Sequence, residues 1–107
     1  MKEKRIYISG KITDLEPIST ADLFRNTALK LLENNYQPFD PLLQIEAQGM
    51  ENEPYDTIMR HVLIHMLQCD ALLMLHNWQD SKGAIIEREL ALKLNMPVFY
   101  SINEIKF

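Results

Sequence analysis

The chain has 107 residues, a mass of about 12.5 kDa and a formal net charge of -4. This length fits one domain over residues 1–107, and 47% hydrophobic with 24% charged residues excludes a disordered chain. The acidity argues against a protein that binds nucleic-acid polymers, which needs a basic face. Small anionic ligands are compatible with it, because backbone amides can hold them without net positive charge.

The composition also bears on the compartment. Cys69 is the single cysteine and cannot form an internal disulfide, which favours a reducing, cytoplasmic location. We read it as a core thiol. The N-terminal residues lack the apolar stretch of a signal peptide, and no run approaches the ~20 apolar residues of a membrane span. We therefore expect no association with a membrane.

Strand-like and helix-like segments alternate along the chain. The predicted elements are, in order, a strand over Arg5–Ser9, a helix over Ile18–Asn35 capped by Ser19 or Thr20, a strand over Tyr36–Phe39, a long loop over Asp40–Pro54, a helix over Tyr55–Gln68, a buried strand over Asp70–Leu75, a polar turn over His76–Lys82, a helix over Gly83–Asn95 and a buried strand over Pro97–Tyr100. The tail, Ser101–Phe107, is too short to assign.

This alternation predicts an α/β fold with three α-β-α layers, similar to flavodoxin-like and Rossmann-like proteins. The sheet is expected to be parallel, with four strands in the order 2-1-3-4 and Pro38 on an edge strand. Ligands bind such sheets at the carboxyl ends of the strands. Three segments should therefore meet there: Ser9, Gly10 and Lys11 after the first strand, residues 76–83 after the third strand, and the start of the third helix.

The third predicted helix carries a carboxylate in its apolar sector. At about 100° per residue, Glu87 falls among the apolar positions of that helix, whereas Glu89 falls outside them. The apolar positions are Gly83, Ala84, Ile86, Leu90, Ala91 and Leu94. Burying a carboxylate is costly unless it has partners or a function. Glu87 is therefore a candidate nucleophile or base, and a hydrogen-bonded structural glutamate is the alternative.

The tetrapeptide before this carboxylate can cap the helix through Asp80 or Ser81. Free amides at a helix start, with a hydroxyl and Gly83, also make a possible phosphate seat, although an ordinary cap is the commoner outcome. Trp78 in the preceding turn could stack on a base or close over the site.

Two motifs together, residues 6–12 (IYISGKI) and residues 80–87 (DSKGAIIE), resemble the nucleoside deoxyribosyltransferase-like superfamily. The resemblance extends from Lys4 to Tyr100 and includes small bacterial and phage members of the superfamily. It implies that Glu87 is the nucleophile, that Tyr7 orients it, that Ser81 binds a phosphate, and that Gly10 lets the ligand approach the backbone. The sequence departs from the family at Val62, where relatives carry an aspartate that supports departure of the base.

The implied reaction cleaves or transfers the N-glycosidic bond of a nucleoside, deoxynucleoside or nucleoside monophosphate, without a cofactor. Glu87 would attack the anomeric carbon, and Asp80 is our candidate for the acid that protonates the departing base. The loss at Val62 favours the alternative, a non-catalytic nucleotide-binding or regulatory module on the same fold. A receiver-like signalling domain fits poorly, because Ser9-Gly10 and His76 stand where receivers need acidic residues.

The predicted helix over residues 55–68 has two further features. His61 and His65 have a spacing that can hold zinc, but no third ligand follows a known pattern, so we expect no metal. The apolar residues of this helix cover more of its circumference than one sheet face requires. We therefore expect a homodimer or larger homo-oligomer that uses this helix, as relatives of the superfamily do.

Overall fold

The computed structural model describes residues 3–13 and 15–107. Its sheet consists of β1 (Arg5–Ser9), β2 (Gln37–Phe39), β3 (Ala71–Met74) and β4 (Val98–Phe99). All neighbouring strands are parallel, in the order β2-β1-β3-β4, with Tyr7 opposite Phe39 on one side and Leu72 on the other. The predicted sheet, its strand order and the edge position of Pro38 are confirmed.

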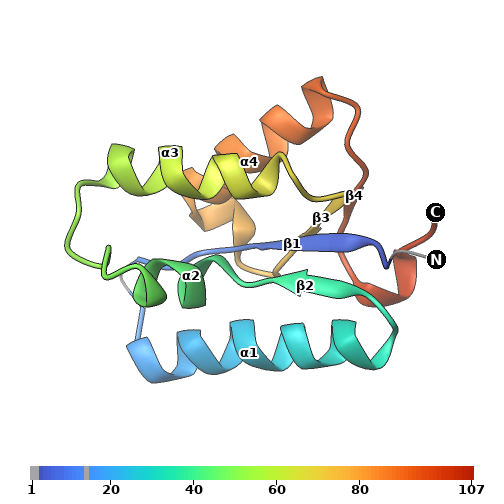
Figure 1. Cartoon of the computed structure of the whole chain (residues 1–107), viewed down its shortest axis with the longest axis horizontal. Helices are drawn as coiled ribbons and strands as arrows, with labels where there is room; N and C mark the ends of the chain where they lie inside the picture. Colours follow the sequence, from blue (N-terminus) through green and yellow to red (C-terminus); the bar gives the residue numbers. More distant parts are fainter. Residues whose placement is uncertain (1–2, 14) are drawn as a thin grey trace.

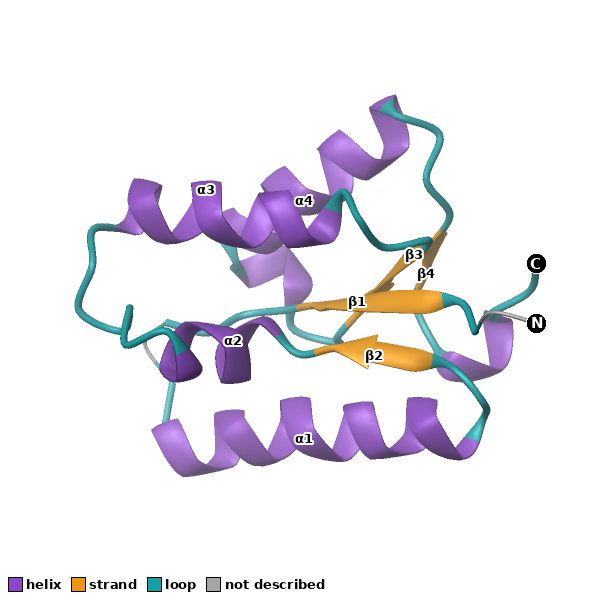
Figure 2. Ribbon diagram, in the orientation of Figure 1, coloured by secondary structure: helices purple, strands orange, loops and turns teal. Residues whose placement is uncertain are grey.

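Helices cover both faces of this sheet (Figures 1 and 2). They are α1 (Pro17–Glu33), α2 (Pro41–Ala47), α3 (Tyr55–Met66) and α4 (Lys82–Lys93). Ile6 and Ile8 point from β1 into the cluster formed with α1, whereas Tyr7 points into the cluster formed with α3 and α4. Side chains along a strand alternate between the two faces of the sheet. The apolar residues of β1 therefore contact helices on both faces, as the predicted three-layer arrangement requires.

The prediction of a loop over Asp40–Pro54 was wrong in its first half, where the structure has the helix α2. The Asp40 carboxylate accepts hydrogen bonds from the Leu42 and Leu43 amides, and Pro41 begins α2 with a backbone already suited to a helix. A capped helix of seven residues is too short to show a clear apolar period. The hydrophobic pattern therefore does not predict α2, although the capping residues Asp40 and Pro41 can be recognised in the sequence.

Other boundaries also differ. Glu16 caps α1 in place of Ser19 or Thr20, because its carboxylate accepts from the Ile18 and Ser19 amides. Asn35 has a φ of 66°, a left-handed backbone that a helix cannot contain, so α1 ends at Glu33. The polar turn contains a short 3-10 helix, η1 (Trp78–Asp80), and a second, η2 (Ile102–Glu104), lies in the tail.

Burial along α4 and β4 is less extensive than predicted. Ile86 and Leu94 are 36% and 53% exposed, because the buried stripe of α4 consists of Ala84, Glu87 and Ala91. The two residues of β4 are half-buried, as expected for an edge strand. Cys69 is buried and unpaired. No helix in the described part of the chain is both long enough and apolar enough to span a membrane.

Candidate functional site

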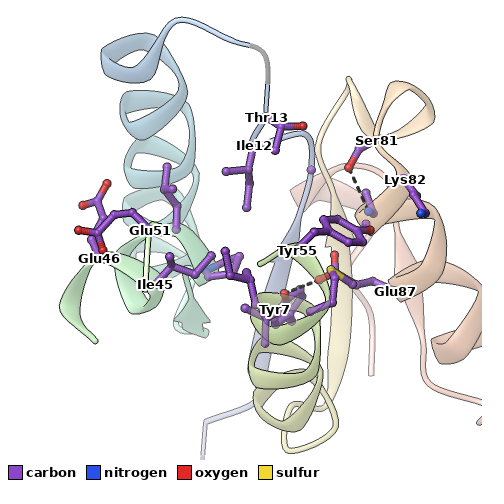
Figure 3. Close-up of a pocket in the computed structure, with 18 of the residues that line it drawn as sticks. Tyr7, Ile12, Thr13, Ile45, Glu46, Glu51, Tyr55, Ser81, Lys82 and Glu87 are labelled. Atoms are coloured by element: carbon purple, nitrogen blue, oxygen red, sulfur yellow. Dashed lines mark hydrogen bonds between the residues drawn. The ribbon is translucent and has the colours of Figure 1, made fainter. Parts of the chain in front are cut away.

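A cavity of about 470 Å³ lies at the carboxyl end of β1. Its walls come from the segment after β1 and from α2, α3 and the start of α4 (Figure 3). Apolar side chains from α2 and α3 make up much of the wall. The lining residues used below are Tyr7, Gly10, Glu46, Glu51, Tyr55, Met59, Val62, Ser81, Lys82, Gly83 and Glu87.

Two hydroxyl groups of β1 hold the Glu87 carboxylate. The Tyr7 hydroxyl donates to Oε2 at 2.5 Å, and the Ser9 hydroxyl donates to Oε1 at 2.6 Å. Tyr7 and Ser9 are two positions apart on the strand, so both side chains leave the same face, which is the face that α4 covers. Tyr7 and Ser9 are fully buried and Glu87 is 6% exposed. The geometry places the carboxylate beside the cavity with both oxygens fixed.

Burial dominates the electrostatics of this group. Desolvation raises the pKa of Glu87 to about 7, and the hydrogen bonds from Ser9 and Tyr7 oppose that rise. Burial, followed by the nearby charge of Glu87, raises the pKa of Tyr7 well above its ordinary value. The proton therefore stays on the tyrosine, and Glu87 is the group that titrates near neutral pH.

The start of α4 forms one side of the cavity. Ser81 caps the helix, since its hydroxyl accepts the Ala84 amide at 3.0 Å. The Lys82 ammonium lies 5.2 Å from the centre of the Tyr55 ring. Ser81 lines the same cavity as Glu87 and Tyr7, and these three residues were predicted to share one site (Figure 3). Gly83 lines it as well.

Gly10 also lines the cavity, but its immediate constraint is packing. A Cβ built on Gly10 would lie 2.7 Å from Cδ1 and 2.9 Å from Cβ of Leu75. Those distances are far below ordinary van der Waals contact. The absence of a side chain thus lets the segment after β1 pass close to the end of β3.

Four of the predicted ligand-facing groups lie elsewhere or act indirectly. Ser9 is bound to Glu87 beneath the cavity. The Lys11 amide donates to Asn77 Oδ1 at 3.0 Å, and the Lys11 side chain is absent from the cavity wall. Asp80 is exposed on η1, outside the wall. Trp78 packs against the Arg88 guanidinium and the Tyr100 ring and is absent from the cavity wall.

Sequence reasoning missed the parts of the wall that come from α2, from the segment after it and from α3. Α2 contributes Ile45 and Glu46, the following segment contributes Glu51, and α3 contributes Tyr55 and Met59. The Asp40-Pro41 cap was an available signal for α2. The inward direction of Tyr55 had no signal, because it depends on how α3 sits against α4.

The two histidines of α3 are absent from the cavity wall. The ring centres of His61 and His65 lie 5.0 Å apart, and His65 stacks on Phe39 at 4.8 Å. Desolvation lowers the pKa of His65, with the charge of His61 contributing. Within residues 3–13 and 15–107, no three His, Cys, Asp or Glu side chains are grouped so that they could hold a metal ion.

Comparison with protein families gives one match over most of the chain. A family model described as a domain of unknown function, DUF4406, matches residues 4–100. Comparison with curated proteins gives no significant match. The site geometry therefore has to carry the functional argument.

Proposed function

Because the chain belongs to the DUF4406 family, whose description assigns no activity, we propose a function from the site itself. The protein cleaves or transfers the N-glycosidic bond of a nucleoside, a deoxynucleoside or a nucleoside monophosphate, with Glu87 as nucleophile. This proposal places it with the nucleoside deoxyribosyltransferase-like proteins that its motifs resemble. The observation that carries the proposal is the buried Glu87 carboxylate, held at both oxygens beside a cavity.

The reaction begins when a Glu87 oxygen attacks the anomeric carbon of the sugar. The bond from that carbon to the base breaks through an oxocarbenium-like transition state, and a glycosyl ester of Glu87 forms. Water then releases the sugar, or a second base accepts it. Tyr7 and Ser9 fix the carboxylate so that the reacting oxygen needs no reorganisation.

The start of α4 supports recognition of the sugar end of the substrate. Ser81 and Lys82 line the cavity close to the first amides of the helix, where partial positive charge favours a hydroxyl oxygen or a phosphate. A cavity of about 470 Å³ is large enough for a nucleoside-sized ligand.

A non-catalytic nucleotide-binding module is the second candidate, and one observation favours it. Val62 lines the cavity, at the position where enzymes of the superfamily that the chain's motifs resemble carry an aspartate. A module of this kind would use the same cavity and would gain stability from its ligand without turning it over.

The test is to incubate the purified protein with a panel of nucleosides and nucleoside monophosphates and to measure free base by chromatography. The catalytic proposal is supported if wild type releases base, if Glu87→Ala abolishes that release and if Glu89→Ala leaves it unchanged. Glu89 is the matched control because it is exposed on the same helix. Thermal stabilisation by a nucleotide without base release supports the binding module.

We also propose that the protein is a homodimer or a larger homo-oligomer that uses α3. Ile64 and Leu67, in and just after that helix, are 60% and 49% exposed, and both are large and apolar. The two positions are three residues apart, so their side chains are neighbours on the helix surface, and contiguous exposed apolar groups mark protein–protein contact sites.

A further inference from the structure

We propose that the preferred substrates of this site are N-glycosides whose base carries a positive charge before it leaves, such as N-alkylpyridinium or N7-alkylpurine nucleosides. This inference rests on the proposed glycosidase or transferase function and names its substrate class. The proton donors and the charges of the cavity wall favour such substrates.

A neutral base departs poorly unless an acid protonates it. The described residues of the cavity wall place no second carboxyl group beside Glu87. The helix α3 contributes Ile58, Met59 and Val62 to the cavity wall. Val62 is buried, and its aliphatic side chain cannot donate a proton. Glu46 and Glu51 belong to the opposite wall, at the other side of the cavity from Glu87 (Figure 3).

The remaining hydroxyl and ammonium groups are weak acids. The Tyr7 proton is engaged with Glu87. Desolvation raises the pKa of the Tyr55 phenol above its ordinary value, which makes that phenol a poorer donor. Ser81 and Thr13 are neutral alcohols, and Lys82 carries an exposed ammonium. A base that already bears a positive charge needs none of these groups, because it leaves as a neutral molecule.

The charge of the wall favours the same class of ligand. Its described charged residues are three carboxylates, Glu46, Glu51 and Glu87, against the single ammonium of Lys82. A cationic ring beside Glu87 would also favour the ionised carboxylate that attack requires. The Tyr55 hydroxyl oxygen and the Met59 sulfur border the start of α4, since a Cβ on Gly83 would lie 3.5 Å and 3.1 Å from them. Aromatic rings and thioethers attract cationic or aromatic groups, and the Tyr55 ring already has the Lys82 ammonium 5.2 Å from its centre.

The step balances without an external acid. A Glu87 oxygen forms a bond to the anomeric carbon, and the electron pair of the carbon–nitrogen bond returns to the ring nitrogen, which becomes neutral. Water then attacks the anomeric carbon, the bond to Glu87 breaks, and one proton is released to solvent. Each turnover therefore gives one neutral base, one free sugar and one proton.

The experiment compares matched nucleosides that differ in the charge of the base. N7-methylguanosine is compared with guanosine, and nicotinamide riboside with its reduced dihydronicotinamide form, each against a blank without protein. We expect wild type to release the cationic base at least about 100-fold faster than its neutral partner, which is the low end of what general-acid assistance contributes. Glu87→Gln should remove the release.

The outcomes separate this inference from the proposed function. Equal release from cationic and neutral partners would overturn the substrate class and leave the glycosidase intact. No release from these four nucleosides or from any deoxynucleoside or nucleoside monophosphate would overturn both. Release from cationic nucleosides alone, lost in Glu87→Gln, supports both.

A gain-of-acid variant gives an independent measurement. Val62→Asp places a carboxyl group on the α3 wall, and Val62→Asn places a polar group of the same size that cannot donate an acidic proton. We expect Val62→Asp to raise base release from guanosine relative to wild type, and Val62→Asn not to raise it. Circular dichroism checks that both variants fold. If either fails to fold, the wild-type comparison still decides.

Discussion

Ser9 and Glu87 are 78 positions apart in the chain, yet the serine hydroxyl lies 2.6 Å from Oε1 of the carboxylate, and both side chains are buried. Tyr7 binds the other oxygen. Among the described residues, no lysine or arginine forms a salt bridge with Glu87. Neutral hydroxyl donors stabilise the charge less than a cation would, which is why desolvation prevails and the carboxylate titrates near neutral pH.

Replacement of Glu87 by glutamine keeps its size and removes its nucleophilic oxygen. If the protein releases base from any nucleoside, Glu87→Gln should lower the rate by at least about a thousandfold, because a covalent nucleophile has no substitute. The matched change Glu89→Gln, on the exposed side of α4, should have little effect. Similar rates for the two variants would exclude Glu87 as the nucleophile.

The rate of base release should rise with pH. Glu87 must be ionised to attack, and its pKa is about 7, so the rate should be half its plateau near that pH and constant above it. Tyr7→Phe removes a hydrogen bond that lowers this pKa, and it should therefore move the midpoint to higher pH. A profile that is flat from pH 5 to pH 9, on the order of two units either side of the pKa, would contradict this assignment.

Folding stability should depend on pH in the opposite direction. The pKa of Glu87 rises on folding from 4.5 to about 7, so its contribution to stability is complete below pH 4.5 and is lost as pH rises through 7. A shift of this size corresponds to about 3 kcal/mol. Denaturant titrations at the two ends of that range should show the loss in wild type and a smaller loss in Glu87→Gln.

Gly10 and Gly83 both line the cavity, but their replacement by alanine should have different consequences. A Cβ at Gly10 meets Leu75 Cβ at 2.9 Å, so Gly10→Ala should cost about 1–3 kcal/mol of stability. A Cβ at Gly83 meets the flexible end of Met59 at 3.1 Å, which can move aside. Because alanine is favoured over glycine in a helix by up to about 1 kcal/mol, Gly83→Ala should cost less stability than Gly10→Ala. Chemical denaturation of both variants measures the contrast, and equal losses would contradict it.

The oligomer proposal has a direct test. Ile64 is 60% exposed on α3, and Ile64→Glu would place a charge in the proposed contact and should yield monomers by light scattering. Leu29→Glu on α1 is the matched control, because that residue is 50% exposed on the other face of the sheet. Monomeric wild type at high micromolar concentration would refute the proposal.

The sequence predicted those features that depend on local pattern or on chain order. The alternation of strands and helices sufficed for the sheet, and the apolar sector of α4 sufficed to single out Glu87. Only one of the two hydrogen-bond partners of that carboxylate was predicted. The family resemblance implied Tyr7, whereas the hydrogen bond from Ser9 was not predicted. Its geometry depends on the approach of α4 to β1, which no local pattern encodes.

The directions of side chains in the turn before α4 were also beyond local pattern. Asp80 and Trp78 are close to Glu87 in sequence, but η1 turns them away from the cavity. Tyr55 and Glu46 are remote in sequence, but α2 and α3 bring them into the wall. Proximity along the chain was therefore a poor guide to proximity in the site.

Because β1 lies between β2 and β3, its two edges are paired at different times during synthesis of the chain. This strand is made early, but its pairing with β3 must wait for residues 71–74 to leave the ribosome. The Tyr7 and Ser9 hydroxyls gain their shared partner later still, when residue 87 follows. A nascent chain therefore passes through a stage with one open edge of β1 and two unmatched hydroxyls; residues 71–74 cover the edge, and the last quarter of the chain supplies Glu87 and β4.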